Sequence, residues 1–180
     1  MGRLLFVFVA MTVLLTACSG ARPHLEMDPS VPEDLETLAD ETWTMFLAAF
    51  PAQHDCIGDA TLVAAWELED RARLDPETRG VTLRVPATAP QLTESMMHEF
   101  GHLLEFACPD HVSLRDAFRD AERLAPDQDW FVAANWEDVP SEHWAEAVVQ
   151  YVIGFRLAHP GAIPVTTAAV TLVAAWAEVD

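Results

Sequence analysis

The sequence has no lysine, and all ten of its basic residues are arginine. Its 29 acidic residues bring the formal net charge to −19 at pH 7. Such a chain has too few cations to neutralise a run of phosphates, so we expect no nucleic-acid partner. A disordered chain is excluded as well, because 51% of the 180 residues are hydrophobic, which is enough for one domain with a real core.

Long apolar runs are also scarce, and the clearest one lies at the N-terminus. Arg3 precedes an apolar run over residues 4–15, and small residues follow it. The run is too short to span a bilayer as a permanent helix. The pattern therefore predicts a secretory signal peptide over residues 1–17.

The end of this segment, Leu15-Thr16-Ala17-Cys18, resembles the lipobox of bacterial lipoproteins. The resemblance implies cleavage before Cys18, lipid on that residue, and an extracytoplasmic protein anchored to the bacterial cell membrane. The alternative is an ordinary signal peptide with an incidental cysteine. Residues 18–30 contain two prolines and no apolar periodicity, so they are predicted to form a lipidated tether before a folded domain over residues 31–180.

Cysteine is rare, with three residues in the whole chain. Apart from Cys18, these are Cys56 and Cys108, and two leftover cysteines in an oxidising compartment usually pair. We therefore expect a disulfide between Cys56 and Cys108. Neither belongs to a close pair of cysteines, which argues against a thiolate metal site.

Apolar periodicity and turn residues predict an α+β fold. Strands are predicted over residues 61–68 and 81–85, and the turn-forming segment LDPETRG at 74–80 lies between them, which indicates a β-hairpin. The hexapeptide TLVAAW occurs at both 61–66 and 171–176. No second copy of another motif accompanies it, so we do not treat it as a structural repeat. Helices are predicted over residues 31–50, 90–107, 113–124, 141–158 and 166–178.

Residues 96–106, MMHEFGHLLEF, place titratable side chains inside an apolar helix. His98 and His102 are four residues apart, so they share one helix face, with Glu99 beside the first. His-Glu-x-x-His on a helix is typical of a zinc site in which the glutamate is the general base. Gly101 costs the helix about 1 kcal/mol relative to alanine, so we expect another backbone to pack closely there. The alternative is a pair of hydrogen-bonded core histidines.

A third ligand is expected from the segment SEHWAEAVVQYV at 141–152. Glu142 and Glu146 are four residues apart and share a helix face, so either carboxylate is a candidate. Together, HEFGH and the later EHWAE resemble the zincin metallopeptidases whose third ligand is a glutamate. The resemblance is to the branch that contains the anthrax lethal factor catalytic domain and the Pro-Pro endopeptidases, and it spans residues 81–151.

This resemblance implies a zincin-like fold, in which a small β-sheet or hairpin packs on the active-site helix and further helices follow. It implies a Zn²⁺ ion bound by His98, His102 and Glu142, with Glu99 as the general base. Glu146 matches a second glutamate that steadies the site through a hydrogen bond. Trp144 and Ala145 match the aromatic and the small residue of the second motif.

The sequence departs from this branch in its tyrosine. The branch usually places a tyrosine shortly before the glutamate helix, where it stabilises the transition state, whereas the single tyrosine here, Tyr151, follows Glu142. Nine residues along a helix put Tyr151 about half a turn out of phase with Glu142, so we expect it to face the core. The remaining candidates for the stabilising group are His143, His111 and Arg84.

Together these features predict an extracytoplasmic, membrane-anchored zinc peptidase that acts on peptides or proteins. Strand 81–85 is expected to be the sheet edge along which an extended substrate lies. The alternative is a non-catalytic zinc-binding lipoprotein that uses a zincin scaffold for binding or structure. Glu99 favours catalysis, because a structural zinc site does not need a carboxylate beside its first ligand. The missing tyrosine favours the alternative.

Overall fold

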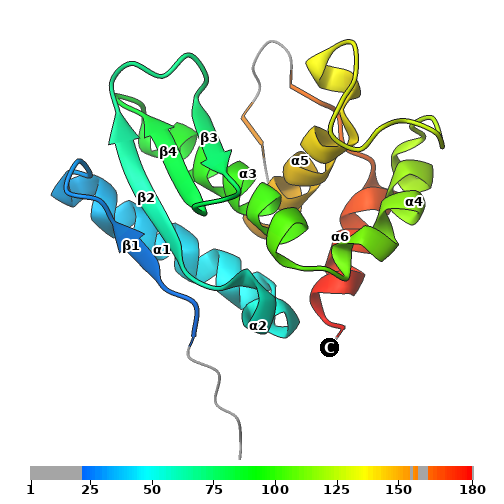
Figure 1. Cartoon of the computed structure of the whole chain (residues 1–180), viewed down its shortest axis with the longest axis horizontal. Helices are drawn as coiled ribbons and strands as arrows, with labels where there is room; N and C mark the ends of the chain where they lie inside the picture. Colours follow the sequence, from blue (N-terminus) through cyan, green and yellow to red (C-terminus); the bar gives the residue numbers. More distant parts are fainter. Residues whose placement is uncertain (1–21, 155, 158–161, 180) are drawn as a thin grey trace, which may run out of the picture.

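A computed structural model describes residues 22–154, 156–157 and 162–179 (Figure 1). The predicted signal peptide and Cys18 lie outside these residues. No helix within the described residues combines the length and the apolarity needed to cross a bilayer. In chain order the elements are β1 (Leu25–Met27), α1 (Glu33–Ala49), the 3-10 helix η1 (Pro51–Gln53), α2 (His54–Ile57), β2 (Ala60–Ala65), β3 (Ala72–Asp75), β4 (Gly80–Arg84), α3 (Ala89–Ala107), α4 (His111–Glu122), the 3-10 helix η2 (Trp136–Asp138), α5 (Pro140–Ile153) and α6 (Thr167–Ala177).

The strands of the described residues form one mixed sheet in the order β1-β2-β4-β3. β2 runs parallel to both β1 and β4, and β3 runs antiparallel to β4. Leu62 of β2 and both Val81 and Leu83 of β4 are fully buried in the core that these strands share with α1 and α3. The α+β class is confirmed, with helices α3 to α6 following the last strand of a small sheet.

The predicted hairpin between residues 61–68 and 81–85 is wrong, because these segments pair in parallel as β2 and β4. The turn chemistry within 74–80 closes a different hairpin, between β3 and β4. There Asp75 Oδ1 accepts hydrogen bonds from the main-chain N–H groups of Glu77 (2.9 Å) and Thr78 (3.3 Å). Strand β3, with the sequence ARLD, was not predicted, although its apolar and charged residues alternate, because four residues are too short a run to indicate a period of two.

The predicted tether is also wrong for residues 25–27, which form β1 and pair with β2. Leu25 is 3% exposed and Val31 is 5% exposed, so both belong to the core. Trp43 of α1 donates its indole N–H to the carbonyl of Pro23 at 3.2 Å. The folded part of the chain therefore begins before residue 31.

Helix α3 lies between the sheet and the C-terminal helices α4 to α6 (Figure 1). Helices α1, α3, α4 and α6 begin and end within two residues of their predicted bounds. Helix α5 was predicted to reach residue 158, which lies outside the described residues, but it ends at Ile153. The reason is Gly154, which takes a left-handed conformation with φ of 78° and caps the helix.

The predicted disulfide is confirmed: Cys56 of α2 is bonded to Cys108, which caps the C-terminal end of α3. The two copies of TLVAAW adopt different structures. The copy at 61–66 forms most of strand β2, whereas the copy at 171–176 lies within helix α6. The repeated hexapeptide is therefore not a structural repeat.

Candidate metal centre

The two sequence motifs meet because α3 and α5 pack in very close contact. A Cβ atom placed on Gly101 of α3 would lie 2.9 Å from the Cα atom of Ala145 in α5. Trp144, fully buried, donates its indole N–H to the carbonyl of Gly101 at 2.9 Å. The close approach expected at Gly101 is confirmed, and it brings the faces of His98 and Glu142 together.

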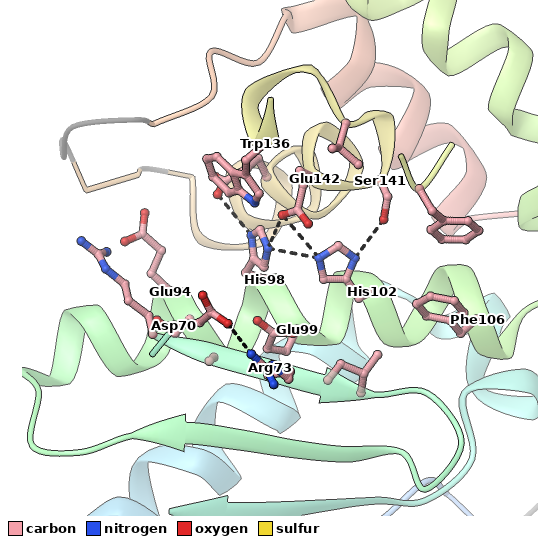
Figure 2. Close-up of a pocket in the computed structure, with 17 residues that line it drawn as sticks. Asp70, Arg73, Glu94, His98, Glu99, His102, Phe106, Trp136, Ser141 and Glu142 are labelled. Carbon is pink, nitrogen blue, oxygen red and sulfur yellow. Dashed lines mark hydrogen bonds and ion pairs between the residues drawn. The ribbon is translucent and has the colours of Figure 1, made fainter. Parts of the chain in front are cut away.

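Three side chains from these helices point at one place, and they could hold a metal ion (Figure 2). His98 Nε2 lies 3.1 Å from His102 Nε2 and 3.1 Å from Glu142 Oε2, and His102 Nε2 lies 3.7 Å from the same carboxylate oxygen. Nitrogen and carboxylate oxygen atoms at such spacing can together bind a single divalent cation. The spacing favours this arrangement over two separate core histidines.

The other nitrogen of each ring is held by a second carboxylate. His98 Nδ1 donates to Glu146 Oε1 at 3.1 Å, and His102 Nδ1 donates to Glu105 Oε1 at 2.6 Å. The hydrogen bond expected from Glu146 is therefore present. Such partners fix the tautomer and the orientation of a ligand histidine, so each Nε2 is directed at the shared point.

Glu105 was missed by the sequence reasoning. Its carboxylate also accepts the indole N–H of Trp130 at 2.6 Å and the hydroxyl of Ser141 at 2.5 Å, so both oxygens are engaged. The one available signal was its position three residues after His102, where the next helical turn brings a side chain back to the same face. It is 3% exposed, as expected for a carboxylate with several donors.

The carboxylates stabilise positive charge on both rings. Burial lowers the pKa of His102, but the hydrogen bonds with Glu105 and Glu142 outweigh it and raise the pKa to about 9. Burial likewise lowers the pKa of His98, and Glu142 and Glu146 more than reverse this. Burial raises the pKa of Glu142, yet the hydrogen bonds from the two histidines hold it well below its usual range. A metal cation that displaced the ring protons would meet the same carboxylates.

Glu99 connects the centre to the edge of the sheet. Its carboxyl group accepts a hydrogen bond from the main chain of Leu74 in β3. Burial raises the pKa of Glu99 above the usual value, and the charges of His98 and His102 lower it by less. The edge strand beside the centre is β3. The expectation that residues 81–85 form this edge is wrong, because β4 lies inside the sheet between β2 and β3.

A cavity of about 650 Å³ opens over the centre, between β3, α3, α5 and the segment that leads into α5 (Figure 2). Asp70 and Glu94 lie at one end of it and Phe106 at the other, with the histidines between them. Phe106 stacks on Phe131 with ring centroids 5.1 Å apart. The described residues lining the cavity are Asp70, Arg71, Ala72, Arg73, Leu74, Glu94, Ser95, His98, Glu99, His102, Phe106, Phe131, Trp136, Val139, Ser141, Glu142 and Glu146.

None of the three candidates for a stabilising group is among these lining residues. His143 Nε2 donates to the carbonyl of Glu137 at 2.9 Å. His111 is fully buried among tryptophans, where burial lowers its pKa to about 3. Arg84 donates to the carbonyl of Glu69 at 3.0 Å. None of the three therefore lies at the wall of this cavity.

Tyr151 faces away from the centre, as predicted from its helical phase. Its hydroxyl donates to the carbonyl of Ala49 at 3.3 Å, and its ring packs edge-on against Phe50.

Comparisons of the chain with protein-family models, with curated proteins and with solved structures found no match. The geometry of the centre is therefore the basis for any functional conclusion.

Proposed function

We propose that this protein is a zinc-dependent peptidase of zincin-like fold, with His98, His102 and Glu142 as the metal ligands and Glu99 as the general base. The observation that supports this most directly is the convergence of the three ligand atoms in the wall of a cavity that Glu99 also lines. A structural zinc site usually closes its coordination with four protein ligands, whereas three ligands and an open cavity suit catalysis.

The ligand spacing is compatible with zinc. Zinc bonds of 2.0–2.1 Å in a tetrahedral arrangement separate the ligand atoms by roughly 3.3 Å. The three separations in this centre are 3.1, 3.1 and 3.7 Å. The pair of outer carboxylates, Glu146 and Glu105, matches the usual support of zinc-bound histidines.

Zinc at this centre would supply Lewis acidity, which activates water as a nucleophile and polarises the carbonyl of a peptide bond. Glu99 would accept a proton from the attacking water and deliver it to the amine as the C–N bond breaks, so that one water molecule is consumed for each bond. Its buried position, which raises its pKa towards neutrality, suits both steps.

The substrate would lie as an extended chain along β3. This strand pairs with β4 on one side, and in the described part of the chain no strand pairs with its other side. Main-chain hydrogen bonds to such an edge hold an extended peptide in register. Because Glu99 contacts Leu74 of β3, a peptide on this edge would pass next to the base.

Trp136, which lines the cavity, would stabilise the oxyanion of the transition state. It lies over His98 and Glu142 at the cavity wall, with its side chain 44% exposed, and its indole N–H is a hydrogen-bond donor (Figure 2). A donor aimed at developing negative charge typically contributes on the order of 10²–10³-fold to turnover.

Metal content and turnover, measured together on purified variants, test this proposal. His98→Ala, His102→Ala and Glu142→Ala each remove a ligand, so zinc content and cleavage of a peptide library should fall together. Glu99→Gln should keep about one zinc per chain while turnover falls by roughly 10²–10⁴-fold, because the amide accepts no proton. Trp136→Phe should keep the zinc and lose turnover alone.

Glu146→Gln is the matched control for the choice of ligand. It should weaken zinc binding by roughly 10–100-fold, since it acts through His98. Loss of the metal in Glu146→Gln with retention in Glu142→Gln would mean that the wrong carboxylate has been chosen. Undiminished cleavage by Glu99→Gln would contradict the peptidase mechanism and leave a zinc-binding scaffold.

We also propose that the protein is exported and anchored through lipid on Cys18. The lipobox-like residues 15–18 support this, and the disulfide agrees with an oxidising compartment. Cys18→Ser should move the protein from the membrane fraction to the soluble fraction, or leave the precursor unprocessed. Lipid on the Cys18→Ser protein, found by mass spectrometry, would rule out this anchor.

A further inference from the structure

Glu94 is a buried carboxylate in the cavity that the proposed mechanism does not use. It lies on α3, one turn before His98 and on the same face of the helix. The residue is 8% exposed, and it lines the cavity. Its Oε1 atom accepts the main-chain N–H of Leu157 at 2.9 Å.

The second carboxylate oxygen of Glu94 lacks a hydrogen-bond donor among the described residues, which is unusual for a buried atom. In the described part of the chain, Oε2 is buried and has no hydrogen-bond partner. Leaving a buried carboxylate oxygen without a donor is costly, and most such atoms in folded proteins are satisfied. A group bound in the cavity would supply the missing donor.

The arginines at this end of the cavity do not fill that role. Arg73 is paired with Asp70 at 2.8 Å. Arg71 is exposed, and among the described residues it makes no ion pair with Glu94. Glu94 is therefore left as a carboxylate without a cationic partner among the described residues at this end of the cavity, while Phe106 lies at the far end (Figure 2).

We propose that Glu94 binds a cationic nitrogen of the substrate and so makes the cavity selective for positively charged peptides. The group bound is the ammonium or guanidinium of a lysine or arginine side chain, or the free amine at a peptide N-terminus. All three offer several N–H donors to one carboxylate oxygen. The net charge of −19 on the whole chain would draw such peptides towards the protein. This inference rests on the proposed peptidase for its substrate class.

The competing explanation is that Glu94 only holds Leu157 in place. The variant Glu94→Gln separates the two, because its amide oxygen still accepts the Leu157 N–H while its negative charge is gone. Glu122 offers a matched control, since it is 7% exposed and its Oε1 also accepts a main-chain N–H, that of Thr166 at 2.9 Å.

The test measures binding in a background without turnover. The full chain with Glu99→Gln is loaded with zinc, immobilised and exposed to three libraries of random octapeptides. The first is N-acetylated and contains lysine and arginine, the second is N-acetylated with glutamine in their place, and the third has glutamine in their place but a free N-terminus. Retained peptides are identified by mass spectrometry.

We expect retention of the first library, the third, or both to exceed that of the second, which identifies the source of the cation. Adding Glu94→Gln should lower that retention by roughly 10–100-fold, as expected for loss of a charge-assisted hydrogen bond, and leave the second library unchanged. Adding Glu122→Gln should change none of the three.

Equal retention of all three libraries by the Glu99→Gln chain with Glu94 intact would overturn the proposal. A loss in Glu94→Gln that is as large for the second library would also overturn it, since that is the result of a structural role. Cleavage by the wild-type chain is assayed separately. Selective retention without any cleavage would contradict the proposed peptidase and support the cation site. Cleavage without charge selection would support the peptidase and contradict the cation site.

Discussion

Each histidine of the candidate metal centre uses its two ring nitrogens for different purposes. Nε2 faces the shared point, and Nδ1 donates to a buried carboxylate, Glu146 for His98 and Glu105 for His102. Glu146 could be predicted because it repeats the helical spacing of Glu142. Glu105 could not be distinguished from other helical acids, because its role depends on Trp130 and Ser141, which reach it only in the folded chain.

Glu105→Gln should weaken zinc binding by roughly 10–100-fold, since an amide is a poorer acceptor for His102 and has no charge to stabilise the metal. Competition with a chelator of known affinity measures the effect. Glu122→Gln is the control, as a second buried glutamate away from the centre. Equal zinc affinity in Glu105→Gln and wild type would show that orientation of His102 does not depend on this carboxylate.

At the scale of the elements, helices were predicted better than strands, and TLVAAW shows why. Its two copies have identical local preferences, yet residues 61–66 are extended beside β1 and β4 while residues 171–176 are helical. Partners distant in sequence decide between these states, and β-propensity depends on such context. The pairing of β2 with β4 and the place of β3 at the edge depend on the same distant contacts.

Gly101 fixes how closely the histidine helix approaches the glutamate helix. The added Cβ atom of Gly101→Ala would meet Ala145 Cα at 2.9 Å and Val148 Cβ at 3.3 Å. Helix propensity favours alanine by about 1 kcal/mol, but overpacking typically costs about 1–3 kcal/mol. The contact with main chain leaves no flexible group to yield, so overpacking should dominate.

We therefore expect Gly101→Ala to lower the free energy of unfolding and to weaken zinc binding, because α3 and α5 must separate. Denaturant titration and zinc titration check the two effects. Ser95→Ala, at a partly exposed position of the same helix, is the control for propensity alone. Increased stability of Gly101→Ala would mean that the helices adjust freely and do not set the ligand spacing.

At the scale of the whole molecule, α3 joins two groups of elements. It packs against β3 and β4 on one side and against α5 on the other, and the disulfide fastens its C-terminal end to α2. The candidate ligands come from α3 itself, His98 and His102, and from α5, Glu142. The sequence predicted helix α3 and the disulfide separately. How the disulfide holds α3 relative to the rest of the fold could not be predicted, because it depends on where α2 and α5 pack.

Reduction of the Cys56–Cys108 bond should lower the free energy of unfolding, while the folded protein keeps the arrangement of His98, His102 and Glu142. The bonded residues are 52 positions apart in sequence. A closed loop of this length restricts the unfolded chain by about 4 kcal/mol in the chain-entropy treatment. Denaturant titration with and without reductant measures the difference, with Cys56→Ala/Cys108→Ala as the matched variant. No difference would mean that strain or residual structure offsets the restriction.

The same bond gives the polypeptide a covalent ring. Residues 57–107, inside that ring, include β2, β3, β4 and all of α3, and the turn at residues 76–78 is exposed. A single cut in this turn, by the protein itself or by another peptidase, would leave both pieces joined through sulfur. The nicked molecule would migrate as one species on a non-reducing gel and separate into two fragments only after the bridge is reduced.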